Sequence, residues 1–383
     1  MSKLDLYPTG IAAMQKPQLT FSQIINMNVG FFGIQYSFGL QQSAVNPIYD
    51  MLGAQPHEIL ILNLAGPMTG LLIQPIIGAL SDRTWSPRFG RRKPFFFIGA
   101  VFCSICLFLY PFSSTLWMAA GLLWVLDAAN NTAMEPYRAL IADKLPENQY
   151  ATGFLTQSFF TGLGITLANL SLFFFQMYIP GTAGSLPVWV YASFFLGSVC
   201  SIASVGWSIY KTPEIPPTPD ELQVLNEKNE GMPHPVIQFF LSVITSLFIY
   251  LLFLVLLIPA IFDRGILRRT IHAIERRPSS KVLFSQNLEI ISAILDMPSV
   301  MWKLALVYLF QWYALFVYWQ NAAKSIAQSV WKTSPSENMD LYEEAWVGQV
   351  SSMAGTMSSL SFRPLHWLVW PSGLVRKRSI LRV

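Results

Sequence analysis

Charged residues are scarce in this sequence. Asp, Glu, Lys and Arg together make up only 12% of its 383 residues, whereas 53% are hydrophobic. Soluble domains carry about twice that charged fraction, so the composition excludes an ordinary soluble fold. The few charges gather in short segments between long apolar stretches. This pattern predicts an all-α integral membrane protein with several transmembrane helices.

Cysteine and histidine are rarer still, and their placement gives little support to an enzyme. The three cysteines (Cys103, Cys106 and Cys200) lie in apolar stretches, and the four histidines are scattered. We therefore expect neither a disulfide framework nor a metal site. The sequence contains no nucleotide-binding loop and no Ser/His/Asp or Cys/His constellation compatible with membrane placement. It predicts no enzyme activity and no cofactor, and its net charge of +4 is better explained by membrane topology than by nucleic-acid binding.

Six apolar stretches are each long enough to cross a hydrocarbon core of about 30 Å. We predict transmembrane helices at 21–48, 58–81, 94–112, 115–137, 151–178 and 187–210, which together form a six-helix N-terminal bundle over 21–210. Lys and Arg occur after the second, fourth and sixth of these spans, and the other three loops contain none. Because basic loops stay in the cytoplasm, this alternation predicts a cytoplasmic N-terminus over 1–20.

The region after the six spans is less regular. We expect 211–298 to be a cytoplasmic central linker that begins with a flexible, Pro-rich segment. It contains an apolar run at 236–262 that is long enough to cross once. Several arginines follow this run, so both of its ends favour the cytoplasm. A re-entrant or surface-lying helix is the preferred interpretation, and a further span is the alternative.

One more span is predicted at 299–322, within the start of a C-terminal bundle at 299–350. Its many aromatic residues are interpreted as packing or interfacial residues. The final segment, 351–383, holds seven serines and five Lys or Arg, but no Asp or Glu and no apolar run of 18 residues. This abrupt change favours a truncated or frameshifted reading frame, with an ordinary cytoplasmic tail as the alternative.

A glycine- and arginine-rich motif lies between the second and third spans. It consists of Gly78, Asp82 and Arg83, followed by Gly90, Arg91 and Arg92. Glycine permits close approach of helices, and an aspartate can form an ion pair that breaks when two halves of a transporter rock. The motif resembles the loop signature of the major facilitator superfamily, Gly-x-x-x-Asp-Arg followed by Gly-Arg-Arg. A basic loop that only sets topology is the alternative.

The fourth span carries a second motif. It reads Asp127-Ala-Ala-Asn-Asn-Thr, followed by Arg138-Ala-Leu-Ile-Ala-Asp. It resembles the fourth helix of the sucrose-transporter family, and the basic loop and Gly30–Gln35 resemble bacterial members of that family. The resemblance covers about 21–210 and, more weakly, 295–350. It implies a multi-pass transporter of the bacterial inner membrane that carries a sucrose- or maltose-like disaccharide with a proton. It also implies that Asp127 takes the proton and that Arg138 helps to hold or gate the sugar.

Asp127 stands out without any resemblance. It lies about 12 residues into its span, or about 18 Å along the helix axis. An ionisable group at that depth is costly and marks an ion or proton path by default. Asp127, Asn131, Met134 and Arg138 share one helical face, which suggests a polar stripe facing a cavity. A structural carboxylate satisfied by neighbouring helices is the alternative.

Amide side chains form further stripes that suit sugar hydroxyls. The candidate substrate-binding residues are Gln35, Gln42, Asn63, Gln74, Asn131, Arg138 and Gln157. Interhelical hydrogen bonds are an equally good explanation for any one of them.

The sequence therefore predicts proton-coupled sugar symport by alternating access, with a small sugar, the proton and the lipid bilayer as partners. Sodium-coupled glycoside or hexuronide symport and a non-functional transporter fragment are the alternatives.

Overall fold

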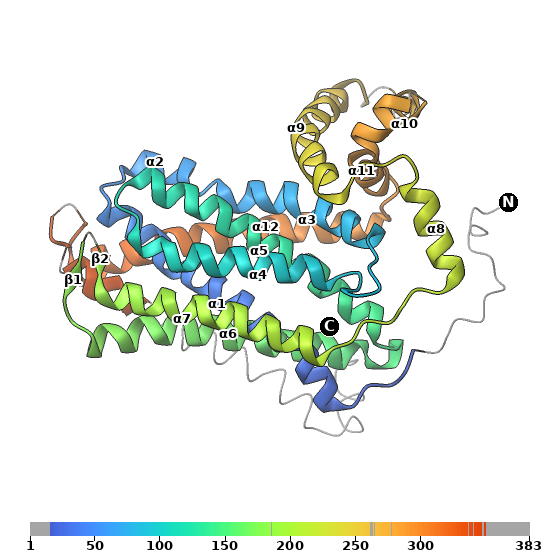
Figure 1. Cartoon of the computed structure of the whole chain (residues 1–383). Coiled ribbons are helices and arrows are strands. Elements are labelled where there is room, and N and C mark those ends of the chain that lie inside the picture. Colours follow the sequence, from blue (N-terminus) through green and yellow to red (C-terminus); the bar gives the residue numbers. More distant parts are fainter. Residues whose placement is uncertain are drawn as a thin grey trace, which may run out of the picture.

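The computed structural model describes residues 16–184, 186–260, 263, 265–276, 278–335, 337–339, 341–346 and 348–349 (Figure 1). The segment 351–383, with its predicted frameshift, and most of 1–20 lie outside the described residues. Within the described part, the chain is almost entirely helical. Its strands are β1 (Thr182–Ala183) and β2 (Leu186–Pro187), which pair as a short antiparallel ribbon. The predicted all-α fold class is confirmed.

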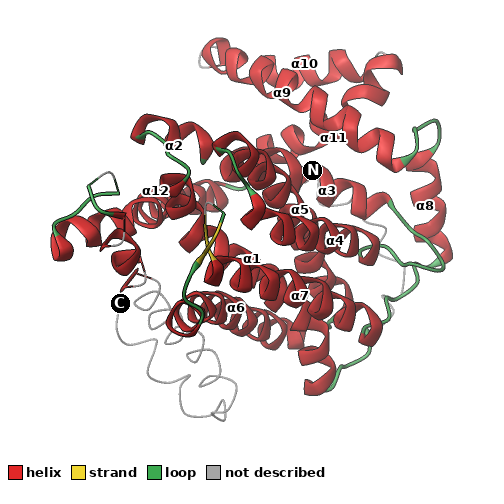
Figure 2. Cartoon of the chain, turned by 60° about the vertical axis from the view of Figure 1, so that its left-hand side comes forward, coloured by secondary structure: helices red, strands yellow, loops and turns green. Residues whose placement is uncertain are grey.

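Six long helices run side by side as one bundle (Figures 1 and 2). They are α1 (Phe21–Met51), α3 (Ala65–Arg83), α4 (Lys93–Leu109), α5 (Leu116–Lys144), α6 (Tyr150–Tyr178) and α7 (Val188–Lys211). Short helical segments join them: α2 (Pro56–Leu62), η1 (Tyr110–Phe112) and η2 (Glu147–Gln149). Helix α1 packs against both α6 and α7, while α5 packs against α3 and α4. Each of the six predicted spans coincides with part of this bundle.

The second predicted span, 58–81, is not one continuous helix. Helix α2 ends at Leu62, and α3 begins at Ala65. Pro67 explains the break, because proline has no N–H to donate to the carbonyl of Asn63 and its ring clashes with that carbonyl. The fourth predicted span ends too early, since α5 continues past Pro136 to Lys144 and buries Leu140 and Ile141.

Glycine allows the bundle helices to approach closely at two positions of the α1 interfaces. A methyl group added at Gly164 of α6 would lie 2.6 Å from the carbonyl oxygen of Phe32, and one at Gly33 would lie 2.7 Å from the Cα atom of Ser201 in α7. These distances leave no room for a side chain. Small residues at such contacts are typical of helices packed within a membrane.

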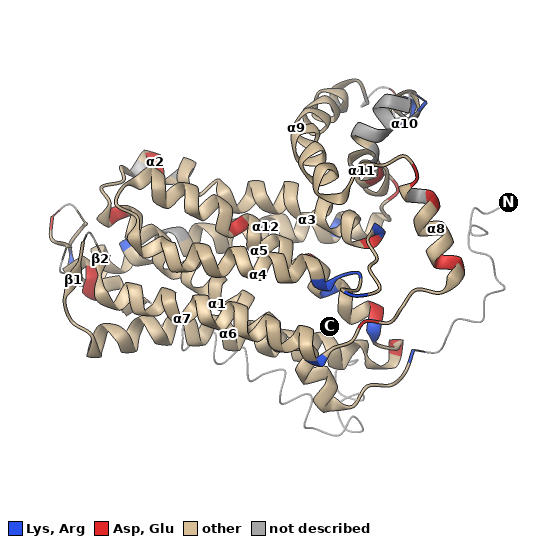
Figure 3. Ribbon diagram, in the orientation of Figure 1, with Lys and Arg blue, Asp and Glu red and all other residues tan. Residues whose placement is uncertain are grey.

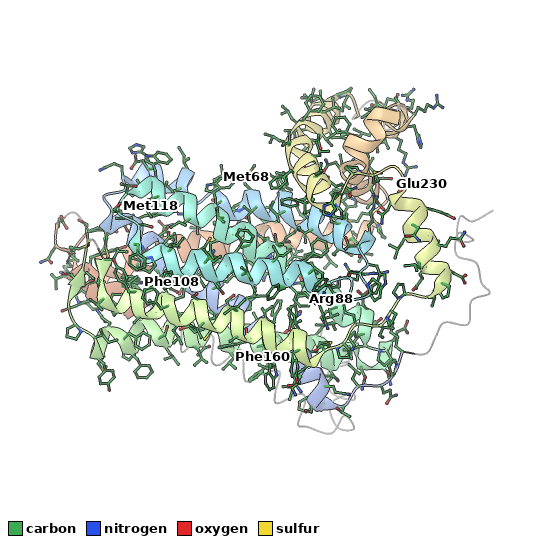
Figure 4. The ribbon with its side chains drawn as sticks, in the orientation of Figure 1. Met68, Arg88, Phe108, Met118, Phe160 and Glu230 are labelled. Carbon is green, nitrogen blue, oxygen red and sulfur yellow. The ribbon has the colours of Figure 1, made fainter. Side chains whose placement is uncertain are left out.

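The outer surface of the bundle is apolar. Phe108 and Met118, for example, are 49% and 41% exposed (Figure 4). Charged side chains gather mainly towards the ends of the bundle helices (Figure 3). Five described segments are long and apolar enough to cross a membrane: Lys93–Phe112, Glu147–Tyr178, Val188–Lys211, Pro235–Leu256 and Ser299–Trp319. The protein is a multi-pass membrane protein.

The region after the bundle is more ordered than the sequence suggests. It forms α8 (Pro219–Asn229), α9 (Pro235–Ala260), α10 (Gly265–Glu275), α11 (Pro278–Leu295), α12 (Ser299–Ile326) and the π-helical turn η3 (Ala327–Trp331). The segment expected to be flexible contains α8, which starts with a capping box between Thr218 and Glu221 and has Pro219 at its first position. Both features stabilise a helix N-terminus. Helix α12 runs beside the bundle and contacts α1 (Figure 1).

Candidate functional site

A cavity of about 390 Å³ lies between α1, α3, α5, α6 and α12. Its polar lining consists of Gln35, Gln41, Gln42, Asn46, Asn63, Gln74, Asp127, Asn131, Arg138 and Thr161. Its aromatic lining consists of Phe31, Phe38, Trp312, Phe316 and Trp319. The structure thus brings together Asp127 and six of the seven predicted substrate-binding residues. Gln157 is the exception, since it is buried in α6 but does not line the cavity.

Asp127 lies halfway along α5, and only 6% of its surface is exposed. The amide side chain of Gln41 lies beside its carboxylate. A methyl group added at Gly66 of α3 would lie 3.8 Å from Asp127 Oδ2 and 3.8 Å from Phe316 Cζ, so the carboxylate and this ring flank the same glycine. Among the residues that the structure describes, no Lys, Arg or His lies within ion-pairing distance of Asp127.

Amide groups on the cavity wall also hold the helices together. Gln74 Nε2 donates a 2.6 Å hydrogen bond to Asn131 Oδ1, and Asn131 Nδ2 donates a 3.0 Å bond to Thr69 Oγ1. Asn63 Nδ2 donates a 2.7 Å bond to Asn46 Oδ1. These bonds match the interhelical explanation of the amide stripes, and sugar binding by the same residues stays a prediction. An amide oxygen can accept two hydrogen bonds and an amide nitrogen can donate two, so these groups retain capacity for a ligand.

Arg138 lines the cavity from α5, eleven residues beyond Asp127. Its guanidinium lies 4.0 Å from Glu135 and is about half exposed. The cavity thus has a fixed positive charge towards one end and a buried carboxyl group near its middle.

Three aromatic side chains of α12 line the cavity. Trp312, Phe316 and Trp319 occupy one face of α12, at steps of four and three residues. Tyr308 and Phe310 are more than half exposed, and for such residues packing or interfacial roles stay the prediction. Flat aromatic faces beside amide and carboxylate groups form a lining suited to sugar rings and their hydroxyl groups.

Arg92 is the centre of the glycine- and arginine-rich motif. Its guanidinium lies 2.5 Å from Asp82 and 2.9 Å from Asp143, and it donates a 2.6 Å hydrogen bond to Ser81. Burial by itself would lower the pKa of Arg92, but the carboxylates of Asp143 and Asp82 more than offset this and raise it. The motif therefore ties the ends of α3, α4 and α5 together around a permanent cation.

Glu214, from the segment after α7, occupies the N-terminus of α4. Its carboxylate accepts hydrogen bonds of 2.8 to 3.1 Å from the backbone N–H groups of Arg91, Arg92 and Lys93. Gly90 has a φ of +80°, and a methyl group there would lie 2.6 Å from Glu214 Oε1. Sequence reasoning missed Glu214, because nothing near it in the chain points to a helix N-terminus 120 residues earlier.

The remaining motif residues have other roles. Arg83 pairs with Glu289 of α11 at 2.5 Å. Gly78 does not allow the close helix approach expected from the sequence, because a methyl group there would meet only Glu135 Cγ, at 3.7 Å. We call the end of the bundle that carries Arg83, Arg88, Arg91, Arg92 and Lys93 the basic end (Figures 3 and 4).

The end of the bundle opposite the basic end is closed by contacts that the sequence did not predict. Lys324 of α12 pairs with Asp50 of α1 at 2.9 Å, and Tyr342 donates a 2.7 Å hydrogen bond to the same carboxylate. Trp346 packs against Trp189 of α7 and donates a 2.6 Å hydrogen bond to the carbonyl oxygen of Ser43. Lys324 in the last turn of α12, and two residues that follow α12, thus connect the helices at this end of the bundle.

Comparisons with known proteins identify similar proteins over part of the chain. No model of a protein family matches it. It is 36% identical over 132 residues to sucrose transport protein SUC4 of Arabidopsis thaliana, which covers 30% of this chain and 26% of that protein. It is 33% identical over 150 residues to sucrose transport protein SUT3 of Oryza sativa subsp. indica, covering 33% and 29%. The chain spans about a quarter of the length of the curated relatives that it matches.

A comparison of structures gives a crystal structure of a D-xylose–proton symporter. The match covers 87% of this chain and 97% of that chain, with 16% sequence identity and a TM-score of 0.43.

Proposed function

We propose that this protein is a secondary transporter of the major facilitator type that carries a sugar together with a proton. One observation carries the proposal: the buried carboxyl group of Asp127 lies midway along the bundle in a cavity of amide and aromatic side chains. Burying an ionisable residue at such a depth costs free energy, so its presence there marks an ion or proton path by default. The partial matches to sucrose transport proteins support a sugar as the substrate.

We further propose a disaccharide of the sucrose or maltose type. The volume of about 390 Å³ lies within the range of small-molecule pockets, about 300–1,000 Å³. The cavity offers hydrogen-bonding groups from α1, α3, α5 and α6 and aromatic faces from α1 and α12, which suits a ligand with two rings. Following the distribution of Lys and Arg, we place the basic end in the cytoplasm.

In this mechanism, Asp127 binds a proton when the cavity is open to the acidic side. Neutralising the carboxyl group lowers the cost of enclosing it in the membrane, so the loaded cavity can close and reopen on the other side. Amides such as Gln74 and Asn131 orient the sugar while also linking α3 to α5. The contacts at the two ends of the bundle form and break as the helices rock.

The decisive experiment compares two modes of transport in proteoliposomes that hold the purified full chain. The wild type is expected to accumulate labelled sucrose or maltose when the outside is acidic, and to exchange labelled for unlabelled sugar without a gradient. Asp127→Asn should lose accumulation and keep exchange, because the amide resembles the protonated acid but cannot release a proton. Glu147→Gln, an exposed position in η2, is the matched control and should keep both.

Accumulation by Asp127→Asn would overturn the role of Asp127. Uptake driven by a sodium gradient, and not by a pH gradient, would show that transport is coupled to sodium and not to protons. A correctly folded wild type with neither accumulation nor exchange would favour a non-functional fragment. Competition by unlabelled glucose as strong as that by sucrose or maltose would contradict the preference for disaccharides.

A further inference from the structure

Helix α9 runs across the bundle helices and not along them. In Figure 1 the bundle helices extend from left to right, whereas α9 is seen nearly end-on; after the turn in Figure 2, α9 extends lengthwise. It contacts α3 on one side and α10 and α11 on the other. If the bundle crosses the membrane, α9 therefore lies roughly in the membrane plane, although its 26 residues are long enough to cross.

The exposed face of α9 is wholly apolar. Ten of its side chains are each more than half exposed: Val236, Ile237, Phe240, Ile244, Leu247, Phe248, Leu251, Leu254, Val255 and Ile258. They follow one another at steps of one, three and four residues and form a stripe along the whole helix. The helix contains no charged residue. An apolar stripe of this size would promote aggregation if it were exposed to water.

The polar residues of α9 are turned inwards. Gln238, Ser242 and Ser246 are buried, and Ser246 donates a 2.7 Å hydrogen bond to Asn287 Oδ1 of α11. Asn287 in turn donates a 3.0 Å bond to Thr245 Oγ1 of α9. Polar groups inside and apolar groups outside are the reverse of a water-exposed helix, and they fit a helix whose outer face touches hydrocarbon.

The helices next to α9 are anchored at the basic end. Glu289 of α11 pairs with Arg83 at 2.5 Å, and Asn229 of α8 donates a 2.9 Å hydrogen bond to the Arg83 carbonyl oxygen. Helix α10 presents Arg268 and Arg269 outwards and turns Leu267 towards α9 and α11. Arg268 pairs with Asp296 and Arg269 with Asp263, and both arginine side chains stay more than half exposed. Exposed arginines beside an apolar helix suit the boundary between acyl chains and lipid headgroups, where basic side chains are favoured.

We propose that α9 lies flat in the membrane leaflet at the basic end, with its apolar stripe facing lipid acyl chains. Helices α10 and α11 cover its polar face. The partner of this surface is the lipid bilayer itself, since the stripe is continuous, uncharged and aligned with the membrane plane. This inference concerns membrane architecture and is independent of sugar transport.

Depth measurements test the proposal. Nitroxide labels would be attached to single cysteines at Ile237, Ile244, Leu251 and Ile258 of the full chain in vesicles, with Cys103, Cys106 and Cys200 replaced by serine. Relative collision with oxygen and with a water-soluble nickel chelate gives the depth of each label. All four labels should have shallow depths that agree to within about one helical turn, 5.4 Å.

Control labels at Val199 and Tyr210 of α7 should differ in depth, because α7 runs along the bundle. A clear maximum of depth between Ile237 and Ile258 would overturn the proposal, and so would labels shielded from oxygen by protein, which would indicate a protein partner.

A second measurement keeps the native cysteines, in case the cysteine-free chain does not fold. Glu230→Cys and Arg276→Cys place exposed thiols before and after α9 (Figure 4 labels Glu230). A membrane-impermeant maleimide should label both from the same face of oriented vesicles, above the background of the unmodified chain. Labelling from opposite faces would show that the segment between them crosses the membrane, and would overturn the proposal.

Discussion

The ammonium group of Lys324 lies 2.9 Å from the carboxylate of Asp50 and so links the end of α12 to the end of α1. The Asp50 side chain is only 3% exposed, and its second oxygen accepts the hydrogen bond from Tyr342. A carboxylate buried to this extent needs such partners, because removing one leaves an uncompensated charge. The pair therefore holds α1 and α12 together at the end opposite the basic end.

We expect Lys324→Ala to open this end of the cavity. Loss of the ammonium group should weaken the contact between α1 and α12, so that a cysteine placed at the cavity residue Gln42 reacts faster with a thiol reagent added from that side. Lys303→Ala, an exposed position near the start of α12, is the control and should leave the rate unchanged. Equal rates for both variants would show that the ion pair does not hold the cavity closed.

Asn131→Ala should reduce both stability and sugar binding. It removes the hydrogen bonds to Gln74 and Thr69, each worth about 0.5–1.5 kcal/mol, from the wall of the cavity. Asn169→Ala is a matched comparison, because Asn169 accepts a buried 2.7 Å bond from Ser43 but does not line the cavity. It should lower the thermal midpoint without changing sugar affinity. If the two variants bind sugar equally well, Asn131 has only a structural role.

Glu214→Ala should lower the stability of the basic end by about 1–2 kcal/mol. The carboxylate satisfies otherwise free backbone N–H groups at the start of α4 and interacts favourably with the helix dipole. Thermal unfolding in detergent measures the loss, and Glu214→Gln should recover part of it through the remaining carbonyl oxygen. Glu230→Ala, at an exposed position after α8, should have no comparable effect. A thermal midpoint unchanged by Glu214→Ala would contradict this role.

Alanine substitution should affect folding stability differently at Gly164 and at Gly70. Gly164→Ala places a methyl group 2.6 Å from a backbone oxygen of α1 and should cost about 1–3 kcal/mol of stability. Gly70 lines the cavity, and a methyl group there meets nothing within 4 Å, so Gly70→Ala should fold normally. The larger Gly70→Leu should fold but lose sugar binding, because it fills the cavity. Normal sugar affinity in Gly70→Leu would place the binding site elsewhere.

The bundle and most of the cavity lining could be predicted from the sequence because both depend on helical periodicity. Gly70 and Gln74 lie four positions apart in α3 and therefore share a face of the second span. Asp127 and Asn131 share a face of the fourth by the same rule. Once these faces turn inwards, a common polar cavity follows.

Contacts between distant segments could not be predicted in this way. Glu214 binds the start of α4, and Lys324 binds the end of α1, but no local pattern assigns either partner. The direction of α9 was open for a related reason. Length and hydropathy show that a helix can cross a membrane, whereas its path depends on what it packs against.

The position of Trp346 has a consequence for the order of folding. Its indole is fully buried between α1 and Trp189, within the apolar core of the first six helices. The ribosome releases this residue only after α12 has been synthesised. The six bundle helices, α1 and α3 to α7, can enter the membrane and pair before then. The packing around Trp189 is complete only when Trp346 has been added. Final packing of the earliest part of the protein is therefore a late event in its biogenesis.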